Sequence, residues 1–191
     1  YAGDTAAKDR FAGLASQPKV VAVGECGLDY YYQHSPKAEQ QAVLRFQIEL
    51  ALRHNLPLTF HVREAFADFW PIFDEYHRAD QPVRGVVHSF TADRHTLEQA
   101  LSRGLYIALN GIMTFTKDAE QLAAAKAVPA DRLLLETDAP FLTPAPYRGN
   151  ICEPKHVRAT LEFLAALREE DTHSLAASTT TNARQLFDLH G

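Results

Sequence analysis

The sequence has few cysteines, no long apolar run and no excess of basic residues, and each absence narrows its function. Cys26 and Cys152 are its only cysteines, and they form neither a CxxC motif nor a disulfide framework, so a reducing cytoplasm is the expected location. No apolar stretch approaches the roughly 18–20 residues that a membrane-spanning helix needs, and no signal-peptide pattern is present, so no membrane partner is expected. The net charge of −5 argues against a large lysine- and arginine-rich surface for nucleic acids. The same charge is compatible with an enzyme that binds the phosphate of its substrate through metal ions.

Methionine is also scarce, and its single position bears on how the chain begins. Residue 1 is Tyr, and the only methionine is Met113. Residues 1–15 have the pattern of a helix that precedes a strand, so the chain is expected to start partway through a βα repeat. No internal repeat, low-complexity tract or long linker divides the sequence. The 191 residues are therefore expected to form one domain, 1–191, which is long enough to bury a substantial core.

Five short apolar runs dominate the pattern that is present. Each is rich in Val, Ile or Leu without alternation, which is typical of strands buried on both faces. The runs are Lys19–Glu25, Pro57–His61, Arg84–His88, Leu105–Asn110 and Arg132–Asp138. Helical patterns separate them, which predicts an α/β fold with parallel strands. In such folds, chemistry gathers at the carboxyl ends of the strands.

The intervening helices are expected from their capping signals. Ser35 before Pro36 indicates one start, Asp68 caps a second helix with Pro71 in its first turn, and Thr91 starts a third that ends near Gly104. The remaining helices are expected at Lys117–Ala127, Pro154–Arg168 and Thr172–Leu189.

Four ligand-type residues fall at the ends of the expected strands: Glu25, His61, His88 and Asp138. Imidazole nitrogen and carboxylate oxygen are the usual ligands of a catalytic Zn²⁺ or similar metal, so these positions together predict a metal site. Taken singly, each has a simpler reading. A histidine after a strand is commonly a hydrogen-bonding loop residue, Glu25 could form a cap or salt bridge, and Asp138 could cap the following turn.

Other polar residues are interpreted from their positions. If the last strand reaches Asp138, Glu136 points to the same side, and one of the two would bind metal or take a proton while the other supports it. His34 is a candidate substrate contact, and Cys26 is expected to face away from Glu25 as a packing thiol. The histidines on helices or helix ends are expected at the solvated surface: His54, His77, His95, His156, His173 and His190.

At these residues the sequence resembles the TatD family of metal-dependent deoxyribonucleases, which are TIM barrels of the amidohydrolase-like group. The resemblance covers nearly the whole chain in collinear order. The matching segments are VAVGECGLDYYY (21–32), PLTFHVREA (57–65), GVVHSF (85–90), LNGIMTF (109–115), LLLETDAPFLTP (133–144), PYRGNICEP (146–154) and TTNARQLF (180–187).

The resemblance implies roles for particular residues. Glu25 matches the glutamate that bridges two divalent ions (Zn, Mg or Mn), and His61 and His88 match the histidines of the second metal. Asp138 matches the aspartate of the first metal, which also helps to activate water. Arg63 and Arg148 fall where the family places groups near the substrate phosphate, a task that suits the forked guanidinium. The implied activity is 3′-to-5′ exonucleolytic hydrolysis of DNA.

One departure from the family pattern is large. The family's first strand ends in an HxH pair that completes the first metal site, and these 191 residues contain no HxH. By alignment, about the first two barrel strands are absent, so an N-terminally truncated barrel is expected. We expect one occupied metal site at most, weak or no activity from this chain alone, and self-association through exposed strand edges.

Two other functions compete with the nuclease. Related barrels use the same ligands on ester, lactone or amide substrates, and turnover of a phosphodiester against an ester would separate these. A non-catalytic chain with a binding role is the third possibility. Its signature would be metal-independent binding that survives Glu25→Ala and His61→Ala.

Overall fold

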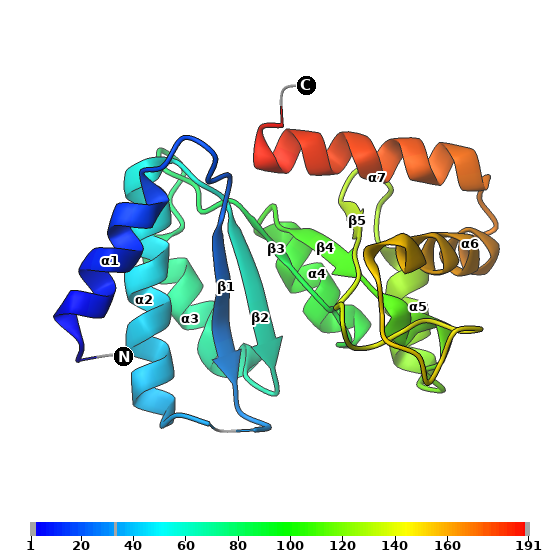
Figure 1. The fold of residues 1–191 in the computed structure, drawn as a ribbon, viewed down its shortest axis with the longest axis horizontal. Helices are drawn as coiled ribbons and strands as arrows, with labels where there is room; N and C mark the ends of the chain where they lie inside the picture. The colour runs from blue at the N-terminus through cyan, green and yellow to red at the C-terminus, as the bar shows by residue number, and fades with distance from the viewer. Residues whose placement is uncertain (1–2, 33, 190–191) are drawn as a thin grey trace. The chain divides into compact units, whose positions relative to one another are not determined.

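The computed structural model describes residues 3–32 and 34–189 (Figure 1). Its strands follow one another in the sheet in chain order, β1-β2-β3-β4-β5. The strands are β1 (Val23–Asp29), β2 (Leu58–Arg63), β3 (Gly85–Val87), β4 (Tyr106–Leu109) and β5 (Leu133–Leu135). The α-helices are α1 (Thr5–Ala15), α2 (Lys37–His54), α3 (Phe66–Tyr76), α4 (Arg94–Ser102), α5 (Ala119–Ala127), α6 (Val157–Arg168) and α7 (Thr172–Phe187), with short 3₁₀ turns η1 (Gly111–Thr114) and η2 (Pro154–His156). The predicted alternation of strands and helices is confirmed.

The chain divides into two compact units, of which the first contains residues 1–86 and 186–191. Its strands β1 and β2 run parallel, with Cys26 opposite Phe60. Helix α2 packs against β1, α1 packs against α2, and α3 contacts α2 and β2 (Figure 1). An aromatic cluster joins β2 to α3, because the Phe60 ring lies 5.1 Å from that of Phe69 and 5.8 Å from that of Phe73. All three side chains are fully buried, so they form the core of this unit.

The second unit contains residues 87–185. Strands β4 and β5 pair in parallel, with Ile107 opposite Leu133. Helix α4 packs against α5, and α6 packs against η1 and α5. Asn182 ties α7 to the strand region, since its buried side-chain amide donates to the carbonyl oxygens of Ala130 and Leu133 at 2.8 Å each. The expected closing helix is therefore present and fastened by a polar contact.

The strands end differently from the prediction in three places. Strand β2 was expected to end at His61 but continues to Arg63, so His61 lies within the strand. Strand β1 continues to Asp29, because its pairing with β2 continues to that residue, so Glu25 lies within the strand and not at its end. The register shifts between Val23 and Cys26, which places Glu25 in an irregular stretch. Strand β5 ends at Leu135, so Glu136 and Asp138 lie in the following loop. The alternation argument for those two residues was therefore wrong.

Two helix starts in the first unit were also predicted wrongly. Helix α2 begins at Lys37 with Pro36 as its N-cap, and no side chain caps it. Helix α3 begins at Phe66, so Asp68 lies inside the first turn and Pro71 beyond it. Asp68 does not cap the helix, because its carboxylate accepts a 2.7 Å hydrogen bond from the Tyr30 hydroxyl.

The start of α4 differs in the second unit. The predicted start was Thr91, but the N-cap is Asp93, whose carboxylate accepts a hydrogen bond from the Thr96 backbone N–H at 2.8 Å. A carboxylate three residues before a free N–H provides the stronger cap here.

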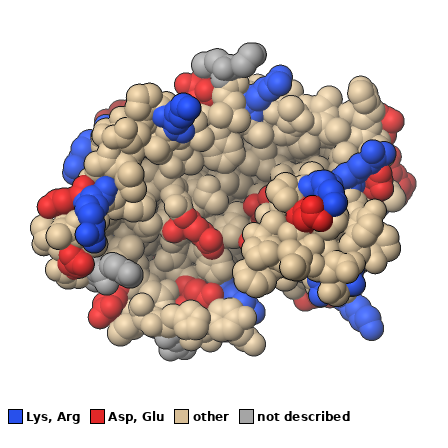
Figure 2. All heavy atoms as spheres, in the orientation of Figure 1, with Lys and Arg blue, Asp and Glu red and all other residues tan. Residues whose placement is uncertain are grey.

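The surface and the helices bear on possible partners. On the face seen in Figure 2, lysine and arginine side chains are scattered among acidic ones and form no continuous stripe. Among the described residues, no helix is long and apolar enough to cross a membrane.

Candidate metal centre

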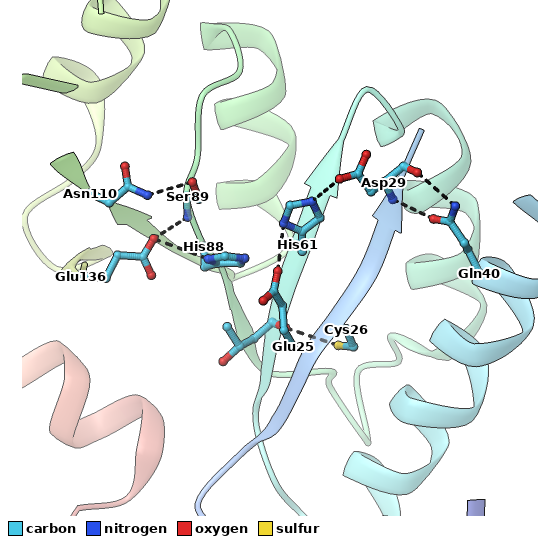
Figure 3. Close-up of polar contacts among 10 residues, drawn as sticks. Glu25, Cys26, Asp29, Gln40, His61, His88, Ser89, Asn110 and Glu136 are labelled. Atoms are coloured by element: carbon cyan, nitrogen blue, oxygen red, sulfur yellow. Dashed lines mark hydrogen bonds and ion pairs between the residues drawn. The ribbon is translucent and has the colours of Figure 1, made fainter. Parts of the chain in front are cut away.

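The first unit brings Glu25 of β1 and His61 of β2 together (Figure 3). The Nδ1 atom of His61 lies 3.0 Å from a carboxylate oxygen of Glu25, and its Nε2 atom lies 3.1 Å from a carboxylate oxygen of Asp29. The imidazole is thus held between two carboxylates. Such a ring can donate Nε2–H to Asp29 and present Nδ1 as a lone-pair donor beside Glu25, an arrangement typical of histidines that bind metals.

Asp29 is a site residue that the sequence reasoning missed. Its other carboxylate oxygen accepts hydrogen bonds from the backbone N–H groups of Tyr31 and Tyr32, each at 2.9 Å. Burial acts to raise the pKa of Asp29, but the hydrogen bonds from Tyr32, His61 and Tyr31 and the attraction to His61 outweigh it, so the pKa lies below its ordinary value. The available signal was an aspartate four residues after Glu25 and two residues after Gly27.

Gly27 allows β1 to approach β2 closely at this point. It pairs with His61, and a Cβ atom built on it would lie 1.8 Å from the His61 carbonyl oxygen. Its φ of +148° is also a conformation that side-chain-bearing residues rarely adopt. A glycine is therefore required between Glu25 and Asp29 for His61 to sit where it does.

In the second unit, a polar network of His88, Ser89, Asn110 and Glu136 joins three predicted strand ends (Figure 3). Glu136, directly after β5, accepts a 2.5 Å hydrogen bond from the Ser89 backbone N–H and lies 3.6 Å from Nδ1 of His88. Asn110, directly after β4, donates its side-chain amide to the Ser89 hydroxyl at 2.8 Å. Ser89 has a φ of +49°, a left-handed conformation that this network stabilises. The network fixes the chain at Ser89, directly after His88.

The other predicted residues of this unit lie in the loop after β5. Asp138 is half-buried, three residues past the strand, and its carbonyl oxygen accepts a hydrogen bond from Phe141 at 2.7 Å. Arg148 is an exposed residue. Its guanidinium lies 3.8 Å from the Phe115 ring centre and donates to the Thr143 carbonyl oxygen at 2.7 Å. Ring and carbonyl together fix the direction of this arginine.

Arg63 closes β2 in the first unit, two residues after His61. Its guanidinium carbon lies 3.9 Å from the ring centre of Tyr31 and 4.8 Å from that of Tyr32. His34 stacks on Tyr32 in turn, with ring centres 5.5 Å apart and planes within 7°. These side chains extend the polar end of β1 and β2 with an aromatic surface.

Two predictions about ordinary residues had different outcomes. Cys26 is buried, with its sulfur 3.5 Å from the Thr59 carbonyl oxygen, and burial, aided by the charge of Glu25, raises the pKa of its thiol. It is a packing thiol, as predicted. His156 was expected at the surface, but it is 7% exposed and stacks on Tyr147, and its Nδ1 accepts a hydrogen bond from the Glu153 N–H at 3.0 Å. That prediction was wrong because the 3₁₀ turn buries the ring.

Comparison with known proteins decides the family. The model of the family described as TatD related DNase matches residues 2–188. The chain belongs to the TatD family. As a TatD protein it is 40% identical over 177 residues to the "uncharacterized metal-dependent hydrolase YabD" of Bacillus subtilis, covering 93% of this chain and 69% of the relative. It is 37% identical over 191 residues to the "3'-5' ssDNA/RNA exonuclease TatD" of Salmonella typhimurium, with 96% and 72% covered.

A solved TatD structure agrees in fold. The crystal structure of YjjV, a TatD homologue from Escherichia coli K12, superposes with a TM-score of 0.89 at 27% identity, over 98% of this chain and 72% of that one. The predicted family and the α/β fold of TatD barrels are confirmed. The chain spans about two thirds of the length of the curated relatives it matches, from 64% to 72%.

Proposed function

We propose that this TatD protein is a metal-dependent phosphodiesterase that shortens DNA from its 3′ end. The observation that carries the proposal is the His61 imidazole held between the carboxylates of Glu25 and Asp29. In a family with relatives named as metal-dependent hydrolases and as a 3'-5' ssDNA/RNA exonuclease, this arrangement has a specific chemical use. We further propose a cytoplasmic location, because both cysteines are free thiols.

The donor set of the first unit fits a divalent ion. A carboxylate oxygen and an imidazole nitrogen 3.0 Å apart can both bind one cation, and Asp29 fixes the ring from the other side. Following the family resemblance, we assign Glu25, His61 and His88 to one ion, since each is of a metal-ligand type. Asp138 would share a second ion with Glu25. Nitrogen donors favour Zn²⁺ or Mn²⁺ over Mg²⁺ for the histidine site.

When bound, such ions neutralise phosphate charge and make water a better nucleophile near neutral pH. The chain's own residues would supply the rest. Asp138 would accept the proton of the attacking water, and Glu136 and Asp29 would orient the two histidines. Arg63 and Arg148 would bind phosphate oxygens, because a guanidinium fork can donate to two of them.

The missing HxH pair sets the expected strength of the activity. No HxH motif occurs in the 191 residues, so the first-metal ligands available here are Glu25 and Asp138. Two carboxylates hold a divalent ion weakly compared with a full set of nitrogen and oxygen ligands. We therefore expect this chain to retain about one ion at most and to turn over slowly.

The test compares substrates and ligand variants in one preparation. Metal content is measured by elemental analysis, and hydrolysis is followed on a 3′-labelled single-stranded oligonucleotide and on a carboxylic ester, with Mn²⁺ or with EDTA. Glu25→Ala and His61→Ala should lose both the ion and the phosphodiester turnover. His173→Ala is the matched control, since that histidine is exposed on α7.

The other outcomes replace the proposal with named alternatives. Metal-dependent turnover of the ester alone would make the protein an ester, lactone or amide hydrolase. No turnover, combined with metal-independent DNA binding that survives Glu25→Ala and His61→Ala, would make it a binding protein. Full nuclease activity from the 191-residue chain would contradict the expectation of an incomplete first metal site.

A further inference from the structure

We infer that the loop after β1 is a stacking site for one unpaired nucleobase beside the metal centre. The inference rests on the proposed function for the identity of the ligand. The site is an aromatic platform made of Tyr31, Tyr32 and His34, residues to which neither the catalytic proposal nor the metal assignment gives a role. Tyr31 is 55% exposed and Tyr32 is 57% exposed, which is unusual for large aromatic side chains.

The platform is already arranged as a stack. His34 lies parallel to Tyr32, with ring centres 5.5 Å apart and planes within 7°. Tyr31 meets Tyr32 edge-on, with centres 4.9 Å apart and an angle of 85°. A further flat ring can extend a parallel stack without rearrangement, and each of the four bases has such a face. The occupant that fits is therefore a base, without preference for its identity.

Positive charge accompanies the rings. The Arg63 guanidinium lies 3.9 Å from the Tyr31 ring centre and 4.8 Å from that of Tyr32. Within residues 3–32 and 34–189, no carboxylate forms a salt bridge with Arg63. Aromatic faces next to an arginine are the usual combination by which proteins hold single-stranded nucleic acid, with the cation at the phosphate and the rings at the bases.

A single carboxylate holds both the platform and the metal-site histidine. One oxygen of Asp29 accepts from the N–H groups of Tyr31 and Tyr32, and the other contacts Nε2 of His61. The backbone N–H of Asp29 donates to the Gln40 side chain at 2.8 Å, which ties this point to α2. The platform is thus fixed relative to His61 by short contacts, so a nucleotide whose phosphate meets the metal centre can place a base on the rings.

The geometry also sets the form of the nucleic acid. In a duplex, both faces of an interior base are covered by its neighbours, so only an unpaired or frayed end offers a free face. We expect the platform to select single-stranded ends and to act on substrate binding more than on the chemical step. Loss of the platform should raise KM more than it lowers kcat.

The experiment uses the full chain in EDTA, so that no hydrolysis occurs and no metal bridges protein and phosphate. Binding of a fluorescent oligothymidylate is measured by anisotropy, beside an abasic oligonucleotide with the same number of phosphates. The wild-type protein should prefer the base-carrying strand by about 5- to 100-fold. Tyr32→Leu and His34→Leu should each lose most of that preference while leaving abasic binding unchanged.

Tyr106→Leu is the matched control. Tyr106 also lies beneath an arginine, with the Arg132 guanidinium 5.3 Å from its ring centre, but it stands at the start of β4. This variant should keep the preference. Because Tyr32 is exposed, its replacement should leave the melting temperature unchanged, which separates lost stacking from lost folding.

The outcomes distinguish this inference from the proposed function. Equal binding of both strands by the wild type, or a base preference that Tyr32→Leu retains, would overturn the stacking site even if the protein hydrolyses DNA. A base preference that depends on Tyr32 would support the stacking site even if no hydrolysis is found. In that case only the proposed nuclease activity would be contradicted.

Discussion

At the scale of single residues, Asp29 is the least obvious part of the centre and the most open to test. Asp29→Asn keeps an oxygen for the N–H groups of Tyr31 and Tyr32 but removes the negative charge from Nε2 of His61. We expect affinity for Zn²⁺ or Mn²⁺ to fall by about 10- to 100-fold, because the histidine loses the carboxylate that fixes its tautomer and raises its basicity. Titration against a competing chelator measures the change.

The matched control for this substitution is Asp118→Asn. Asp118 also accepts backbone hydrogen bonds, from Glu120 at 2.9 Å and Gln121 at 3.3 Å, as the N-cap of α5. It should leave metal affinity unchanged. Equal affinities for the wild type and Asp29→Asn would mean that Asp29 organises the tyrosine loop and has no influence on His61.

Gly27 gives a second prediction at this scale. Gly27→Ala places a methyl group 1.8 Å from the His61 carbonyl oxygen at a φ of +148°. We expect a loss of about 3 kcal/mol or more in the free energy of unfolding, because β1 and β2 must separate to admit it. Gly13→Ala in α1 is the control, since nothing lies within 4 Å of its added Cβ. It should stabilise the protein by about 0.5–1 kcal/mol, and urea unfolding measures both.

The sequence indicates candidate ligands by their residue type, but it does not show which residues contact them. Glu25, His61 and His88 could be proposed as ligands because each follows or lies within an apolar run and is of a metal-ligand type. Asp29 was missed because its role depends on the register in which Gly27 faces His61, and register is a long-range property. The same holds for His156, which is buried by packing against Tyr147. The type of a residue is read from the sequence directly, whereas its contacts depend on residues far away in the chain.

At the scale of elements, a double hydrogen bond connects α2 to α3. The Arg45 guanidinium donates to both carboxylate oxygens of Glu75 at 2.9 Å each. These hydrogen bonds hold the pKa of Glu75 below its ordinary value, against a smaller opposite effect of burial. Both side chains are partly exposed, at 34% and 47%, so solvent screening limits the pair to about 0.5–1 kcal/mol.

The pH dependence follows from the direction of that shift. A carboxyl with a lowered pKa stabilises the fold fully above its unfolded value, about 4.3 for glutamate, and the contribution disappears as the pH falls through the folded value. Glu75→Gln should therefore reduce the free energy of unfolding at neutral pH and reduce it by less at about pH 3. Urea unfolding at both pH values checks this. A difference that grows on acidification would contradict the assignment.

The sequence predicted the positions of the helices better than the residues at which they begin. The positions of the helices followed from apolar spacing, and α5, α6 and α7 each lie within the predicted ranges. The starts of α3 and α4 did not follow, because several polar residues near each start could cap it. Tertiary contacts decide among them. The Asp68 carboxylate accepts a hydrogen bond from the Tyr30 hydroxyl, whereas the Asp93 carboxylate accepts one from the Thr96 N–H and caps α4. Which polar residue caps a helix therefore depends on its tertiary contacts, and a local sequence pattern does not contain these.

At the scale of the whole molecule, the order of the strands in residues 3–32 and 34–189 leaves β1 and β5 at the two ends of the sheet. A terminal parallel strand has backbone groups without a neighbouring strand on one side, which favours pairing with another chain. We therefore predict association that increases with protein concentration and that salt does not reverse. Light scattering coupled to size exclusion tests it. A mass of 21.3 kDa at every concentration would show that the strand ends are sufficiently covered.

Metal binding should also be measurable in the stability of the whole chain. A ligand that binds the folded state alone adds about 2.7 kcal/mol at a free concentration of one hundred times Kd. For a chain of this size, that raises Tm by about 5–10 °C. We expect Zn²⁺ or Mn²⁺ to produce such a rise in the wild type and not in Glu25→Ala, which lacks the carboxylate beside His61.

Glu162→Gln controls for the loss of one negative charge, because Glu162 is exposed and pairs with Arg158 on the same helix, α6. It should retain the metal-dependent rise in full. Calorimetry with and without EDTA measures all three proteins. A rise that persists in Glu25→Ala would place the stabilising ion elsewhere in the chain, since an ion held by Glu25 and His61 cannot keep its affinity when one of these ligands is removed.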